Sequence, residues 1–98
     1  MPSANHPETT KVRESECVLY EPETGQIRHM HLTLVLKGGH DPSEAETEAM
    51  AHAALERRGK AHAHLKALHV SHDSVKPYSH YRVDVGKKSL IEIKPANG

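Results

Sequence analysis

The chain has 98 residues, in which 13 Lys plus Arg balance 13 Asp plus Glu, and its only aromatic residues are three tyrosines. This length corresponds to one domain, and the balanced charge argues against nucleic acid or a membrane surface as a partner. Because aromatic side chains supply much of the area in most cores, the core must be thin, which predicts a marginally stable monomer or a homodimer.

The cysteine content and the lack of long apolar stretches indicate the compartment. Cys17 is the only cysteine, so no intramolecular disulfide can form and a cytoplasmic location is expected. Residues 1–10 are polar and lack the apolar region of a signal peptide. The longest apolar stretch, 32–36, is too short to span a bilayer, so no membrane partner is predicted.

The first part of the chain predicts a β-hairpin. Residues 1–11, with two prolines and small polar residues, are expected to form a disordered tail before a single domain at 12–95. Residues 12–20 and 26–36 alternate as strands do, and the short turn 21–25 separates them. One face of the second strand carries Met30, Leu32, Leu34 and Leu36, and the other carries Ile27, His29, His31, Thr33 and Val35.

Residues 41–58 carry the clearest helix signals. Asp41 is predicted to be the N-cap, and Glu44 stands three residues later, in the position of a capping box. Gly59 follows two arginines and is typical of the left-handed residue that ends a helix. The helix is rich in alanine, so it can lie close to a sheet; its larger apolar residues are Met50 and Leu55.

The segment after this helix is ambiguous. Its alanines and leucines fit a helix continued through Gly59 to about His69, but they also alternate as in a strand. The strong stop at Gly59 favours a strand at 62–71. A loop at 72–77 and a hairpin formed by 78–85 and 89–94 are expected to follow, before a frayed C-terminus at 96–98.

These elements predict an α+β fold in the order β-β-α-β-β-β, with one helix packed on a single mostly antiparallel sheet. We expect the helix to cover the more apolar face of the second strand. This arrangement leaves the other face open, with His29, His31 and, on a later strand, His62 and His64 exposed.

Histidine is the compositional outlier, with ten residues in 98. The pairs His29/His31 and His62/His64 have His-x-His spacing, which places two imidazoles on the same side of a strand, and four nitrogens could bind Zn²⁺ if the strands were neighbours. The alternative interpretation is that neutral imidazoles are tolerated polar residues on an exposed face. The sequence contains neither His-Glu-x-x-His nor a Cys/His zinc pattern.

The sequence therefore predicts a non-enzymatic domain that associates with a protein partner, or with itself as a homodimer, through an open histidine-rich sheet face. We expect that face also to carry Ile27, Val35, Leu68 and Val70. A metal-binding protein or small metalloenzyme that uses the His-x-His pairs is the alternative. No catalytic residue is predicted, because Cys17 fits a core position and the adjacent residue types of Ser71–Ser74 do not make a triad.

Overall fold

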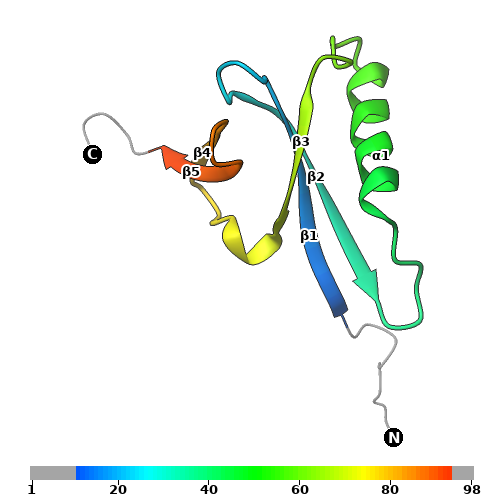
Figure 1. Ribbon diagram of the computed structural model, residues 1–98. Coiled ribbons are helices and arrows are strands. Elements are labelled where there is room, and N and C mark those ends of the chain that lie inside the picture. The colour runs from blue at the N-terminus through cyan, green and yellow to red at the C-terminus, as the bar shows by residue number, and fades with distance from the viewer. Residues whose placement is uncertain (1–10, 94–98) are drawn as a thin grey trace, which may run out of the picture.

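Residues 11–93 are described by a computed structural model and form five strands and one α-helix (Figure 1). The order β-β-α-β-β-β confirms the prediction. The elements are β1 (Lys11–Tyr20), β2 (Ile27–Leu36), α1 (Glu44–Arg57), β3 (Lys66–Ser71), the 3₁₀ turn η2 (His72–Ser74), β4 (His80–Asp84) and β5 (Ser89–Ile93). The predicted frayed C-terminus and, except for Lys11, the predicted N-terminal tail lie outside the described residues.

The main sheet has the strand order β2-β1-β3, and its central strand β1 is antiparallel to both neighbours. β4 and β5 pair with each other as a second, two-stranded antiparallel sheet. The predicted packing of one helix on a mostly antiparallel sheet is confirmed. The β4–β5 hairpin packs against that sheet as a separate layer instead of extending it.

α1 and the β4–β5 hairpin lie on opposite faces of the main sheet (Figure 1). Both faces of β1 are apolar near its end, because successive residues of a strand point to opposite sides. The core on the helix side contains Cys17, Leu19, Ala51, Leu55 and Leu65. The core on the hairpin side contains Val18, Tyr20 and Val83, with Met30, Leu68, Val70 and Leu90 packed against them.

The helix covers the opposite face of β2 from the predicted one. Cys17 and Leu19 pack under α1, and their cross-strand partners on β2 are His31 and His29. Directly opposite residues share a face, so the histidines lie on the helix side and the apolar residues of β2 on the hairpin side. The connection β2-α1-β3 joins two parallel strands, and such crossovers are right-handed in about 98% of cases, so strand order decides which face is covered.

The helix also begins later than predicted. Ser43, and not Asp41, is the N-cap: its Oγ accepts from the Glu46 amide at 3.1 Å, and Glu46 Oε1 accepts from the Ser43 amide at 2.7 Å. Asp41 instead accepts a hydrogen bond from the Arg13 guanidinium on β1. Both residue types are good N-caps, so this tertiary contact separates them. Gly59 has φ 69°, which confirms the predicted left-handed end.

The ambiguous segment forms the strand β3, and the alternative of a prolonged helix is wrong. β3 begins at Lys66, four residues later than predicted, so His62 and His64 lie in the connection before it. The backbone turns there through hydrogen bonds from the Gly59 and Lys60 amides to the last turn of α1.

The turn between β1 and β2 anchors the β4–β5 hairpin. Val83 N–H donates to the Gly25 carbonyl at 2.8 Å, and Gly25 has φ 79°. A Cβ at Gly25 would lie 1.9 Å from the Val83 carbonyl oxygen, so only glycine permits this approach. The sequence indicated the turn but not this contact.

Candidate protein interface on strand β2

Burial along β1 changes from one end to the other. Lys11, Val12 and Arg13 are exposed, whereas Cys17 to Tyr20 are buried. The hairpin packs over the buried end, around Val18 and Tyr20. The other end of the same face has no comparable cover among the described residues.

Three leucines of β2 lie at this uncovered end, and we call Leu32, Leu34 and Leu36 the leucine row. Their exposed fractions are 48%, 48% and 38%. On the helix side of the same strand, Thr33 and Val35 are 8% and 4% exposed. The strand is therefore buried on its helix side and presents apolar side chains to the solvent on the other.

The part of β1 beside the leucine row is polar. Glu16 pairs with Leu32 and Glu14 with Leu34 in the β1–β2 register. Glu14 accepts from Lys11 at 3.0 Å, and Glu16 contacts His72 Nδ1 at 2.8 Å. The row thus borders on two carboxylates that already have partners, and one of them, Glu16, is buried.

β2 is also an edge strand, because among residues 11–93 it pairs only with β1. It has ten residues, and after Arg28 it contains no Lys, Arg, Asp, Glu, Pro or Gly. Charges and prolines are the usual means of preventing an edge strand from pairing with another chain. The opposite edge, β3, has six residues and begins at Lys66.

A hollow of about 510 Å³ lies where β2 meets α1. Thr33 and Leu34 line it from the strand, and Pro42, Ala49 and Met50 from the helix and its N-terminal approach. Met50 is 42% exposed. Apolar surface is therefore available on both sides of the β2 edge.

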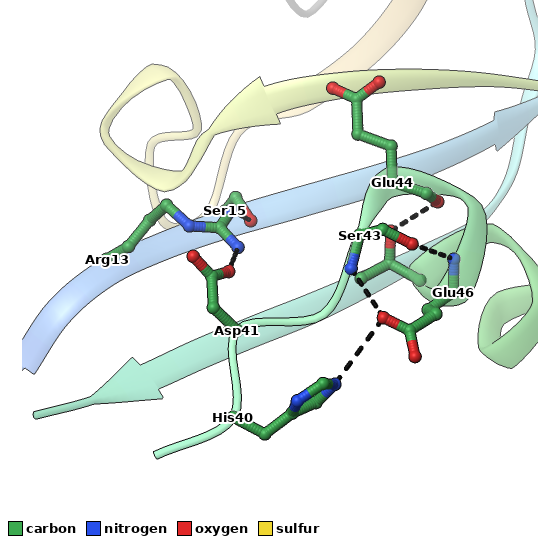
Figure 2. A network of polar contacts seen from close by, with 8 residues as sticks. Arg13, Ser15, His40, Asp41, Ser43, Glu44 and Glu46 are labelled. Carbon is green, nitrogen blue, oxygen red and sulfur yellow. Dashed lines mark hydrogen bonds and ion pairs between the residues drawn. The ribbon is translucent and has the colours of Figure 1, made fainter. Parts of the chain in front are cut away.

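A polar network ties the start of α1 to β1 on the helix side of the sheet (Figure 2). Arg13 donates to Asp41 and, at 2.8 Å, to Ser15 Oγ, while Glu46 belongs to the capping box and lies 3.5 Å from His40 Nε2. The hydrogen bond from the Ser43 amide lowers the pKa of Glu46. These groups bind one another, and we assign them a structural role.

The four histidines predicted as metal ligands belong to different environments. His29 and His31 lie side by side on β2 with ring centroids 6.3 Å apart. His62 Nδ1 is 2.9 Å from His52 Nδ1, and His64 Nε2 is 2.9 Å from Glu21. Within residues 11–93 no group of three or more His, Cys, Asp or Glu is placed to hold a metal ion.

Most of the other histidine contacts involve glutamates. His69 Nε2 lies 2.6 Å from Glu48, as His72 lies beside Glu16. The hydrogen bond from Arg28, with a smaller contribution from His64, lowers the pKa of Glu21. The histidine surplus thus supplies local polar partners on the surface, which sequence spacing did not reveal.

The Nε2 atom of His29 and the thiol of Cys17 are two buried groups on the helix side that have the chemistry of a ligand or nucleophile. His29 Nε2 is buried and, in the described part of the chain, has no hydrogen-bond partner. Burial, the positive charge of Arg58 and the neighbouring His31 lower the pKa of His29. Burial, together with Glu48 and Glu44, raises the pKa of Cys17 to about 11, so this core residue is not a reactive thiolate.

Comparison with protein-family models, with curated proteins and with solved structures finds no match. In the part of the chain that the structure describes, no helix has the length and apolarity needed to cross a membrane. The surface of β2 is therefore interpreted from its own geometry.

Proposed function

We propose that this chain is a non-enzymatic domain that binds another protein chain through the outer edge of β2 and the leucine row. The observation that carries the proposal is the exposure of Leu32 and Leu34, each 48%, on an edge strand that has no Lys, Arg, Asp or Glu after Arg28. A partner that adds a strand to this edge gains backbone hydrogen bonds, while its side chains bury the leucines.

Two further features support this proposal over a histidine-based interface. His29, His31 and Val35 lie on the helix side, whereas Leu68 and Val70 lie on the hairpin side, so they do not form one open face. Among residues 11–93, three exposed leucines instead stand in one row on β2, on the side away from the helix. Buried Cys17 is consistent with action in a reducing cytoplasm.

Site-specific photo-crosslinking in the cells that produce the protein tests the proposal. A photoreactive amino acid at position 34 is expected to give a covalent adduct with a protein chain. The control is position 78, because Tyr78 is fully exposed and lies on the loop before β4. Equal labelling from both positions, or no adduct from position 34, would contradict the proposal.

Metal binding is the second candidate, and the Nε2 of His29, which has no partner within residues 11–93 and lies next to His31, favours it. Two imidazoles leave a tetrahedral Zn²⁺ ion short of ligands, so this site would need further donors from a ligand or a second chain. Calorimetric titration with Zn²⁺ should give submicromolar stoichiometric binding that His29→Ala abolishes. Weak binding that survives the substitution would exclude the site, and His80→Ala on β4 is the control.

A further inference from the structure

The apolar residues of β2 have a symmetry that the leucine row alone does not show. Met30, Leu32, Leu34 and Leu36 occupy alternate positions on the hairpin side of the strand, and Thr33 stands at their centre. A second copy of β2, turned by a two-fold axis through Thr33, would place Leu32 opposite Leu34 and Met30 opposite Leu36. All four apolar residues would then meet apolar residues.

We infer that the partner of β2 is a second copy of this chain, paired antiparallel about Thr33 into a continuous six-stranded sheet. This inference rests on the proposed function and specifies its partner. A two-fold axis perpendicular to the sheet keeps the hairpin sides of both copies on the same face, so the two leucine rows form one strip. Such an isologous contact needs a self-complementary surface, which the pattern of β2 provides.

Neighbouring registers are less favourable. An axis through Leu32 would place Leu36 opposite Arg28, and an axis through Leu34 would place Met30 opposite Gly38. An axis through the midpoint between two residues would bring hairpin-side residues of one copy opposite helix-side residues of the other. Only the Thr33 axis matches all four residues, Met30, Leu32, Leu34 and Leu36, with one another.

The helix side of the edge fits the same axis. Thr33 lines the hollow between β2 and α1, so the hollows of the two copies would flank the axis together. Met50 is 42% exposed at this hollow, and the dimer would cover the Met50 side chain of each copy. β2 contains no Lys, Arg, Asp or Glu after Arg28. When its histidines are neutral, two copies of this part of the strand therefore meet without charge repulsion.

The oligomeric state of the full chain provides the first test. Sedimentation over a hundredfold range of concentration should show a reversible monomer–dimer equilibrium. Leu34→Glu should weaken the dimer by at least about 100-fold, because each dimer would bury two unpaired carboxylates. The matched control is Val85→Glu, at an exposed apolar residue in the β4–β5 turn, which should leave the equilibrium unchanged.

Disulfide trapping tests the register. Directly opposite Cα atoms of antiparallel strands lie about 4.5–5.5 Å apart, within the range of a disulfide, whereas diagonal neighbours are too distant. Mixed oxidation of Leu32→Cys with Leu34→Cys, one of them carrying a size tag, should therefore give about tenfold more linked dimer than either variant alone. Cys17 is buried, so the wild-type chain is the blank.

The outcomes separate the two proposals. A dimer weakened by Leu34→Glu alone and trapped by the mixed pair supports both. A monomer at all concentrations that still gives adducts with other proteins at position 34 overturns the second copy and leaves the proposed function. A monomer without adducts overturns both. A dimer trapped instead by Leu34→Cys alone, or weakened by Val85→Glu, overturns the Thr33 register.

Discussion

The two ends of the β1–β2 hairpin differ in how many of their faces are covered. Near Leu19 and Tyr20 the sheet lies between α1 and the β4–β5 hairpin, and both residues are buried. Near Leu34 and Leu36 the described residues cover only the helix side, and the leucines are partly exposed on the other. The same strands are thus packed on both faces at one end and on one face at the other.

This difference shows that apolar pattern and burial are separate properties. Met30 and Leu34 belong to the same alternating row, yet Met30 packs against the hairpin-side core and Leu34 does not. Leucines on a solvent-facing edge strand favour unwanted association with other chains. A functional contact would explain why leucines occupy these positions.

The largest effect on stability should appear when one leucine at each end of the β1–β2 hairpin is truncated to alanine. Leu19→Ala should lower the free energy of unfolding by about 3 kcal/mol, because Leu19 is fully buried and the deletion leaves a cavity. Leu34→Ala should cost less than about 1 kcal/mol in the monomer. Urea denaturation at low protein concentration measures both, and equal losses would contradict the comparison.

Gly25→Ala should detach the hairpin layer from the covered end. The added methyl would collide with the Val83 carbonyl, so we expect a loss of about 2–3 kcal/mol and faster hydrogen exchange in β4. Gly38→Ala is the control, since Gly38 has φ 81° but no atom within 4 Å of the added Cβ. The control isolates the backbone cost of about 1 kcal/mol, and an equal loss in both variants would refute the contact.

Ser43→Ala should have a smaller effect, at the half-covered end where α1 begins. Loss of the capping box should cost about 1 kcal/mol, whereas Asp41→Ala removes an exposed ion pair worth at most about 0.5 kcal/mol. Thermal unfolding of the two variants compares them. A greater loss for Asp41→Ala would restore Asp41 as the more important residue.

The smallest effect concerns pH and His29 on the helix side of β2. Its pKa is lowered in the folded state, so below the unfolded-state pKa of about 6.5 the unfolded chain binds more protons and stability falls. His29→Gln should therefore make the stability curve shallower between pH 8 and 5. An unchanged slope would show that other groups cause the loss of stability.

Sequence reasoning located the elements well because their signals are local. Strand alternation around Cys17 and Leu32 and the left-handed Gly59 each depend on neighbouring residues. The prediction of Asp41 as the N-cap was wrong because Asp41 and Ser43 are locally equivalent caps. Arg13, on the distant strand β1, binds Asp41 and leaves Ser43 as the cap. The proposed interface was predicted only in part. The alternation of β2 placed the leucine row on one face, but that face was predicted to lie beneath the helix.

By itself, the sequence determined the order of elements, the two-sided apolar character of β1 and the alternation that gathers the leucines on one face of β2. Only the tertiary structure decided which face α1 covers, how far the hairpin reaches and which edge stays unpaired. The reason is that strand order, crossover hand and the approach of Val83 to Gly25 depend on contacts between distant residues. The solvent exposure of Leu34 is a consequence of that arrangement and not of its neighbours in the chain.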